Sequence, residues 1–528
     1  MSTNQFTEQE LNNLPKSVLI KLILGLQENV IELNRSVQNL TEQIKIMNQR
    51  KYGRKTETVS ALQISFDFGF NEAECLEDPN EPEPSLEKAA PRKPRPKGKR
   101  AEDISKVTNH REVPVELSES ELIARFGENG WKRLPDQIIT KLEHIPASFE
   151  AITYKIGVYA GKKDGTIIRA DKPVELWQNS IATPTLVSSI IVGKYVNGVP
   201  LYRQEQAYNP SEVFINRINM ANWMIKTSDL YLNHYVQGLK NNLIQQKYLH
   251  ADETPVLVSK DGREASTKSY MWVYRSIRGR GDPQIVIYDY QKTRSSVHPE
   301  RFLKDFNGTM ITDGYDSYHK LERDHPMRFT VAGCWVHAKR KFSEYVKSIG
   351  KKSAKGTVAE AAVNKIAKIY HEEHKLNDLS YDKKLEGRQK IIKPLVDDFF
   401  EFIKKKSEFI DPSSATGRAI SYAVNQEKYL RVFLDDANIP LDNNTAEQAI
   451  RPFCVGRKNW VMIDTIRGAD ASAVLYSVTE TAKANNLKIY DYLVYLLTEL
   501  PKYIHDFNTE VPEHLYPWSE SFPKELFK

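Results

Sequence analysis

Three acidic motifs that lie far apart in the sequence hold the residue types best suited to chemistry. They are residues 250–256 (HADETPV), 311–318 (ITDGYDSY) and 442–460 (DNNTAEQAIRPFCVGRKNW). Short β-rich runs lead into the first two, and the third opens a predicted helix that ends in a basic segment. Converging carboxylates without softer ligands nearby are what hard divalent cations prefer. Two such cations can clamp a phosphodiester during in-line displacement.

Asp252, Asp313 and Glu447 meet only if the intervening chain builds one α/β sheet, because no local spacing brings them together. Side chains alternate along a strand, so Asp252 and Glu253 cannot both face one metal ion. For Glu447 alone, the alternative is a first-turn glutamate that follows good N-cap residue types, is stabilised by the helix dipole and is paired with Arg451.

The chain carries several further motifs in a fixed order. They are residues 51–57, 194–206 (KYVNGVPLYRQEQ), 288–303 (YDYQKTRSSVHPERFL), 333–342 (GCWVHAKRKF), 442–452 (DNNTAEQAIRP), 476–487 (YSVTETAKANNL) and 515–518. In this order they resemble the insertion-sequence-66 family of bacterial transposases, whose chemistry is carried by an Asp-Asp-Glu triad. A single DETP motif would carry little weight, whereas this collinear set is specific.

The resemblance implies that Asp252, Asp313 and Glu447 are the catalytic, metal-binding residues and leaves Glu253 outside the site. It also implies a ribonuclease-H-like catalytic domain and DNA strand cleavage and transfer. The expected cofactors are two Mg²⁺ or Mn²⁺ ions. The expected partners are the terminal inverted repeats of a mobile element, target DNA, and accessory proteins encoded by the same element.

Basic and aromatic residues near the acids are candidates for DNA contacts. They are Arg451, Arg457, Lys458 and Trp460 in the third motif, and His337, Arg340 and Lys341 in residues 333–342. Cations would hold the DNA backbone, and Trp460 would stack on a distorted end base. The alternatives are a basic surface loop with a core tryptophan, and a buried histidine without a catalytic part. Cys334 and His337 alone do not make a zinc site.

Bulk properties set limits on the class of protein. With 528 residues, several domains are expected. A net charge of +6 permits nucleic-acid binding without demanding it. Three widely separated cysteines indicate a reducing compartment, and no run of 18 apolar residues occurs. We therefore expect a cytoplasmic protein without membrane partners. No P-loop pattern occurs, which disfavours ATP-driven chemistry.

The first fifty residues predict a coiled coil that makes the protein a homodimer or a higher oligomer. Apolar residues alternate at spacings of four and three, with β-branched a positions and leucine-rich d positions. They are Ile23, Val30, Val37 and Ile44 at a, and Leu19, Leu26, Leu33, Leu40 and Met47 at d. The alternative is a helix packed against its own protein.

The chain is therefore predicted to be multidomain. Residues 1–50 form the coiled coil, 51–109 a charged linker, 110–180 a small β-rich module, and 181–245 a helix-turn-helix-like DNA-binding region. Residues 246–345 and 422–485 form the catalytic domain, 346–421 a helical insertion, and 486–528 a tail. The family usually carries a four-cysteine zinc element within 110–180. No cysteine lies between Cys75 and Cys334 here, so we expect no zinc. Residues 371–374 (HEEH) are interpreted as an exposed helix face.

Two other functions compete with an active transposase. One is a catalytically inactive DNA-binding protein derived from a transposase, and the other is a stand-alone nuclease. A nuclease would share the metal site but have less use for the coiled coil.

Overall fold

A computed structural model describes residues 15–52, short stretches between 120 and 177, and residues 180–208, 215–264, 267–279, 281–503 and 510–528. Backbone contacts divide the chain into one unit of Met1–Lys55 with Thr153–Lys528 and another of Thr56–Ile152. Apart from Lys51 and Tyr52, which end the N-terminal helix, the predicted linker lies outside the described residues, as does most of the predicted 110–180 module. From that module the structure describes a short antiparallel pair, β1 (Val158–Ala160) and β2 (Ile167–Arg169).

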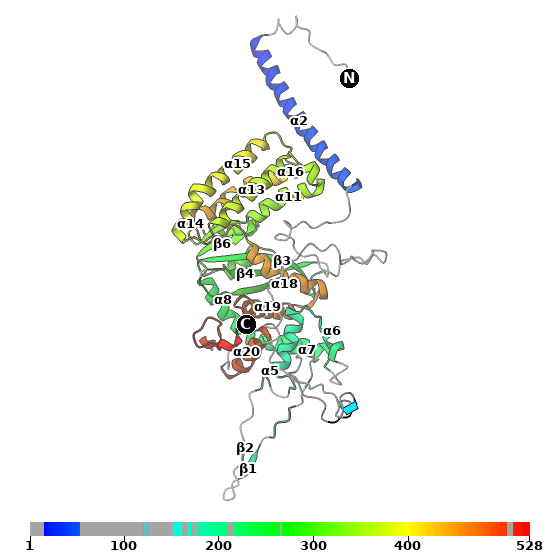
Figure 1. Ribbon diagram of the computed structural model, residues 1–528, viewed down its shortest axis with the longest axis vertical. Helices are drawn as coiled ribbons and strands as arrows, with labels where there is room; N and C mark the ends of the chain where they lie inside the picture. The colour runs from blue at the N-terminus through cyan, green and yellow to red at the C-terminus, as the bar shows by residue number, and fades with distance from the viewer. Residues whose placement is uncertain are drawn as a thin grey trace. The chain divides into compact units, whose positions relative to one another are not determined.

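A mixed sheet lies at the centre of the larger unit (Figure 1). Its strands run in the order β5-β4-β3-β6-β7, and β8 (Ile463–Thr465) pairs with the far end of β3. The five principal strands are β3 (Tyr248–Lys260), β4 (Lys268–Ser276), β5 (Val286–Gln291), β6 (Gly308–Thr312) and β7 (Phe329–Gly333). β4 runs antiparallel to both β3 and β5, and β3, β6 and β7 are parallel. The sequence pattern predicts three strands at 248–258, 269–275 and 284–290, a crossover helix at 299–306 and a fourth strand at 309–312. The structure has this order, with α9 (Val297–Phe302) as the crossover.

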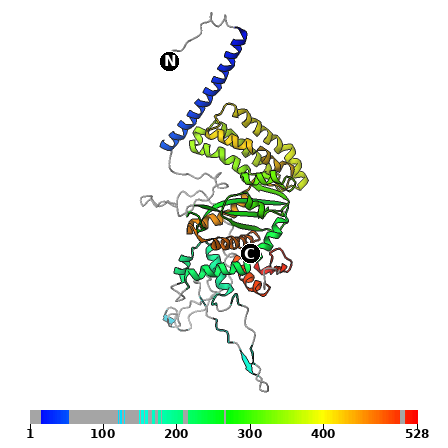
Figure 2. The same ribbon diagram turned by 180° about the vertical axis from the view of Figure 1, so that it is seen from behind.

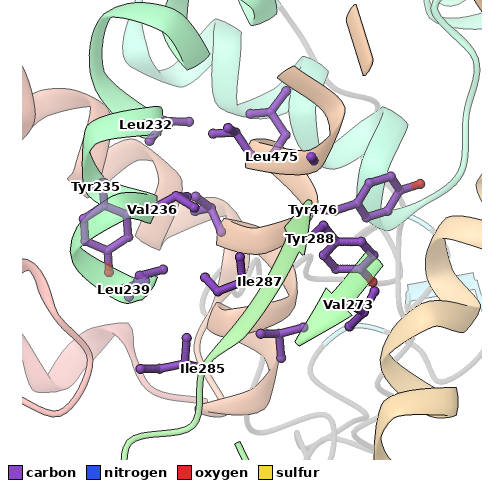
Figure 3. Packing of buried hydrophobic residues seen from close by; sticks show 14 of the residues in the cluster. Leu232, Tyr235, Val236, Leu239, Val273, Ile285, Ile287, Tyr288, Leu475 and Tyr476 are labelled. Atoms are coloured by element: carbon purple, nitrogen blue, oxygen red, sulfur yellow. The ribbon is translucent and has the colours of Figure 1, made fainter. Parts of the chain in front are cut away.

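Helices cover both faces of this sheet (Figures 1 and 2). The β4 and β5 side chains are buried on both faces, so these strands need cover on either side. Along the free edge of β5 lies α19 (Ile466–Ala484), whose residues 471–482 are buried throughout. Its Ser477 Oγ accepts a hydrogen bond from the N–H of Tyr288 (2.8 Å), and its Thr481 Oγ1 accepts one from the N–H of Val286 (3.0 Å). Tyr288 points toward Tyr476, whereas Ile287 points to the opposite side, toward Leu239 (Figure 3). The helices that contribute to the same hydrophobic cluster are α5 (Pro184–Ile191), α6 (Leu201–Tyr208), α7 (Arg217–Thr227), α8 (Asn233–Ile244), α19 and α20 (Ile489–Tyr503). On one face of the sheet, Phe302 of α9 stacks on Tyr274 of β4.

The predicted DNA-binding region, 181–245, is helical and shares its hydrophobic core with the sheet. Val187, Met220 and Leu239 belong to the same buried cluster as Val273 of β4. The predicted tail joins that cluster through Leu496 of α20 and through residues 515–526. A helix-turn-helix role for 181–245 stays a prediction.

The other face of the sheet packs against the helical insertion, which the sequence predicted at 346–421. Ile311 of β6 and Ala332 of β7 share a second buried cluster with Phe399 and Ile420 of the insertion. The helices of this layer are α11 (Trp335–Ile349), α12 (Lys351–Ala354), α13 (Val358–Lys375), α14 (Tyr381–Gly387), α15 (Lys393–Ser407), α16 (Ala415–Asn425) and α17 (Glu427–Arg431). The insertion therefore completes the core of the sheet.

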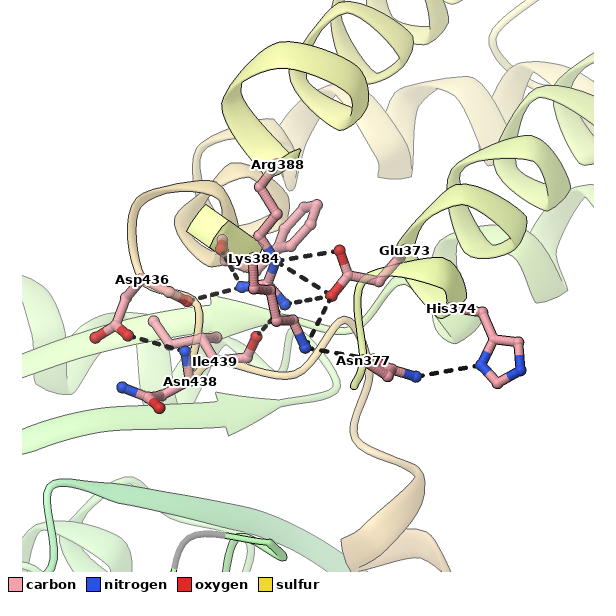
Figure 4. Close-up of polar contacts among 9 residues, drawn as sticks. Glu373, His374, Asn377, Lys384, Arg388, Asp436, Asn438 and Ile439 are labelled. Carbon is pink, nitrogen blue, oxygen red and sulfur yellow. Dashed lines mark hydrogen bonds and ion pairs between the residues drawn. The ribbon is translucent and has the colours of Figure 1, made fainter. Parts of the chain in front are cut away.

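A buried ion pair joins the insertion to the segment that leads into the third acidic motif (Figure 4). Arg388, fully buried, donates from Nε to Glu373, and from Nη1 and Nη2 to the carbonyls of Phe433 (2.6 Å), Asp436 (2.7 Å) and Ile439 (3.0 Å). The expected exposed face at 371–374 is wrong for Glu373, which is 6% exposed. The HEEH pattern gave no sign of a partner fifteen residues away.

The N-terminal helix, α2 (Lys16–Tyr52), carries the predicted a and d residues. Seven of these residues are 52–65% exposed, so the part of the chain that the structure describes leaves the seam largely uncovered. They are Ile23, Leu26, Val30, Leu33, Val37, Leu40 and Ile44. A coiled coil remains a prediction that this exposure favours. No described helix is both long and apolar enough to cross a lipid bilayer.

Candidate active site

The sheet register sets the first two predicted acids side by side. Strand β3 pairs in parallel with β6, with His250 opposite Ile311. Continued by two residues, this register sets Asp252 beside Asp313, which follows the last residue of β6. The backbone N–H of Glu253 donates to Asp252 Oδ1 (2.9 Å). Two strands distant in sequence thus bring two carboxylates to one position on the sheet.

A tight turn holds Asp313. Gly314 adopts φ +93°, a conformation that an L side chain rarely takes, and a Cβ there would lie 3.0 Å from the hydroxyl of Tyr422. The N–H of Tyr315 donates to Asp313 Oδ1 (3.0 Å), and the Tyr422 hydroxyl donates to the Asp313 carbonyl (2.8 Å). Tyr422 belongs to α16 (Ala415–Asn425), which begins in the predicted insertion and runs past its predicted end at 421, so the last helix of the insertion helps to fix the second acid.

Glu447 lies in the first turn of α18 (Asn444–Trp460) and is 8% exposed. Asn443, fully buried at the start of this helix, ties it to β3. Its Nδ2 donates to the carbonyl of Ala251 (2.9 Å), and its Oδ1 accepts from Nδ1 of His250 (2.7 Å). Asn443 was expected among N-cap residue types, but its side chain makes no cap bond and binds the strand instead. The two strand residues that Asn443 binds, His250 and Ala251, directly precede Asp252. This contact therefore holds the start of the helix that carries Glu447 close to Asp252.

The three carboxylates influence one another electrostatically. Burial raises the pKa of Asp252 well above its usual range, and the nearby Glu253, Asp313 and Glu447 raise it further. Burial also raises the pKa of Glu447; Arg340 opposes the shift, while Asp442 and Asp313 add to it. Like charges held this close disfavour ionisation, and a bound cation reverses that preference. The three carboxylates themselves offer oxygen ligands, which suit Mg²⁺ or Mn²⁺.

His337 and Cys334 lie nearer to Glu447 than the sequence indicated. Ligand atoms of these three residues all lie within 4.8 Å of one another. His337 Nδ1 is 3.7 Å from Glu447 Oε1, and neither atom has a hydrogen-bond partner among the described residues. Burial lowers the pKa of His337 to about 4 and raises that of the Cys334 thiol, so both are neutral near pH 7. The sequence offered only Cys334 and His337 as a pair, and Glu447 was not recognised as their neighbour.

Glu253 and Asp316 flank the predicted triad in different ways. Glu253 is 1% exposed and forms an ion pair with Arg294, while the Tyr318 hydroxyl donates to its second oxygen (3.0 Å). Asp316 begins α10 (Asp316–Asp324), is 78% exposed and pairs with Arg323 at 3.3 Å. Asp316 is therefore a surface residue that is paired with Arg323. Arg294 was missed, because a partner 41 residues away leaves no local signal.

The predicted DNA contacts fall into two groups. Arg340 lies inside the acidic site, 3.3 Å from Glu447, and the Lys341 ammonium lies over the Tyr422 ring at 5.6 Å. Arg457 donates to Thr254 Oγ1 (3.2 Å) of β3, whereas Lys458 and Arg451 are exposed along α18.

Trp460 is partly buried, edge-on to Tyr195 at 6.4 Å, and close to Gly456, where a Cβ would collide with its ring. This packing favours the alternative of a core tryptophan, although stacking on a DNA base stays a prediction.

Comparison with known proteins identifies the family. A sequence profile described as "Transposase IS66 family" matches residues 179–471, more than half of the chain. A second, described as "Transposase C of IS166 homeodomain", matches residues 39–111. Two similar proteins come from Sinorhizobium fredii. Uncharacterized protein y4qI is 27% identical over 88% of this chain and 86% of its own length, and uncharacterized protein y4jD is 25% identical over 90% and 93%. The chain belongs to the IS66 family of transposases.

Proposed function

We propose that this IS66-family transposase is catalytically active, binding the ends of its mobile element and performing metal-dependent strand cleavage and strand transfer. The observation that carries the proposal is the packing of β3, β6 and α18. The β3–β6 register supports a position for Asp252 beside Asp313, and Asn443 ties the start of α18, which carries Glu447, to β3. Asp313 and Glu447 are also near enough to raise the pKa of Asp252. The strand order β5-β4-β3-β6-β7 supports a ribonuclease-H-like assignment for this domain.

Asp252, Asp313 and Glu447 would hold the divalent ions. Two bound ions would activate the attacking water or DNA 3′-hydroxyl and stabilise the leaving oxygen. The chain's own part is to set the geometry, through the Asn443 anchor and the Gly314 turn. Arg340 keeps Glu447 charge-compensated before the ions bind, since its guanidinium lies 3.3 Å from the carboxylate.

Positive residues around the acids would position the DNA. Arg340 and Lys341 border the site on one side, and Arg451, Arg457 and Lys458 continue along α18 from Glu447. Neutral His337, beside Glu447, would contact the DNA or order the site. Phosphate contacts of this kind orient a duplex without reading its sequence. The uncovered seam of α2 supports pairing of two copies, which suits the joining of two element ends.

The test is Mg²⁺-dependent cleavage of a labelled duplex carrying the element end. We expect Asp252→Asn, Asp313→Asn and Glu447→Gln each to abolish cleavage, because each removes a charged ligand from a shared metal site. Asp316→Asn is the matched control: the same chemical change at a 78% exposed neighbour of Asp313 should leave cleavage intact.

If wild type binds the duplex with cations present but never cuts it, the alternative of an inactive DNA-binding protein holds. If all three triad variants cut normally, the assigned site is wrong.

A further inference from the structure

A cavity of about 560 Å³ lies beside α18, outside the acidic site. Gln448, Arg451 and Val455 of α18 form one wall, and Arg275 of β4 and Lys483 of α19 form others. At about 100° per residue, this wall is roughly a quarter turn around the helix from Glu447. The cavity therefore flanks the site on the helix that carries the third acid.

Arg275 is the unusual group in this cavity. It is 4% exposed, and its Nε has no hydrogen-bond partner among the described residues. Its Nη1 donates only a long bond, 3.4 Å, to the carbonyl of Thr445, two residues before Glu447. A buried charge without a direct carboxylate partner is costly, so such a group is retained where something else compensates it.

The rest of the lining is also positive. Arg278, Arg451 and Lys483 face the same space, and Glu480 is the one acidic side chain among the described residues that line it. Glu480 lies 3.6 Å from Lys483, so its charge is already matched. Burial and the neighbouring Arg278 lower the pKa of Arg275 to about 10, which leaves it charged near pH 7. Among the described residues that line it, the cavity therefore carries more positive than negative side-chain charge.

We propose that this cavity binds a phosphodiester of the DNA strand on which the enzyme acts. The phosphodiester is a monoanion, and its oxygens supply the acceptors that arginine donors match. The volume admits a phosphate with its flanking sugars. A DNA strand whose scissile phosphate lies at Asp252, Asp313 and Glu447 would bring a neighbouring phosphate within reach of this face of α18. The identity of the strand rests on the proposed function, but the anion site does not.

The test measures DNA affinity against salt, in chelator, by fluorescence anisotropy with a labelled element-end duplex. The variant is Arg278→Gln combined with Lys483→Gln, which alters the cavity without touching the predicted contacts of α18. Losing one phosphate contact lowers the slope of log K against log salt by about 0.9. At 0.1 M salt this corresponds to about eightfold weaker binding. Arg323→Gln, an exposed arginine on α10 (54% exposed), should change neither slope nor affinity.

The outcomes separate the two proposals. If the double variant binds with the wild-type slope, the cavity inference is overturned even where cleavage is normal. If the slope falls but wild type never cleaves, the cavity inference stands and the catalytic proposal fails. A third arm adds inorganic phosphate at constant ionic strength and records thermal stability. Stabilisation of wild type alone, with unchanged DNA binding in the variant, would assign the site to free phosphate and overturn the DNA assignment.

Discussion

The ion pair between Arg388 and Glu373 should be among the most sensitive points of the insertion. The change is Arg388→Met, which keeps length and volume but removes the charge and every donor. It leaves Glu373 buried at 6% exposure, with Lys384 at 3.4 Å as its remaining partner. It also removes the donors to the carbonyls of Phe433, Asp436 and Ile439.

The expected loss of stability follows from those contacts. Removing one member of a buried ion pair costs about 3–5 kcal/mol. Lys384 compensates part of the charge that Glu373 keeps when Arg388 is replaced. We therefore expect a loss of stability at the lower end of that range, about 3 kcal/mol. For a domain of this size, about 2 °C of melting temperature is lost per kcal/mol, which gives a decrease of about 6 °C. Thermal unfolding followed by near-ultraviolet circular dichroism measures it.

Lys390→Met is the matched control, two residues along the chain. Lys390 pairs with Glu386 on the surface, with side chains 72% and 58% exposed, and such pairs contribute about 0.5 kcal/mol or less. Its melting temperature should fall by no more than about 1 °C. Adding Glu373→Gln to Arg388→Met should recover part of the loss, because the stranded charge is then gone. If Arg388→Met melts with the control, or if the double variant is worse than the single, the reasoning about this pair is refuted.

Three further predictions concern the site, the seam and the DNA. Combining Asp252→Asn with Glu447→Gln should lower the cleavage rate no further than either change alone, since one missing ligand already disables the metal pair. Additive losses of rate in single-turnover assays would contradict a shared site. Leu26→Glu with Leu33→Glu should convert a dimer or higher oligomer to monomer in sedimentation experiments, because both side chains lie in the uncovered seam at 62% and 65% exposure. An oligomer of unchanged mass would rule out the α2 seam as the interface. DNA binding should survive removal of divalent metal, because cations of the protein make the phosphate contacts; complete loss in mobility shifts with chelator would reverse that assignment.

The sheet was predictable because its signals are local. Runs such as residues 269–275 and 284–290 are rich in the apolar and aromatic residues that fill a half-buried or fully buried strand, and glycine-containing turns separate them. The predicted strands agree with β3 to β6 to within two or three residues. The place of Asp313 directly after a strand was predictable for the same reason.

The partners of the acids were not predictable, because each comes from a distant part of the chain. Glu253 is neutralised by Arg294 across 41 residues, and His337 meets Glu447 across more than a hundred. Strand alternation predicted only that Glu253 faces away from Asp252, whereas the structure shows that its side chain is buried and paired with Arg294. These pairs form because the tertiary fold brings the residues together, and they cannot be predicted from sequence spacing or composition.

The helical insertion helps to hold Asp313 and Glu447 in position. Its helix α16 reaches the second acid through the Tyr422 hydroxyl, and Arg388 holds three carbonyls of the segment that leads to the third. On the sheet side, the indole of Trp335 donates to the carbonyl of Leu430 (2.8 Å), which fixes the return of the chain. A short loop between β7 and α18 would connect the same elements without these anchors. The helical insertion therefore ties the positions of Asp313 and Glu447 to one packed core. A substitution inside that core should shift the two carboxylates even though the substituted residue contacts neither of them.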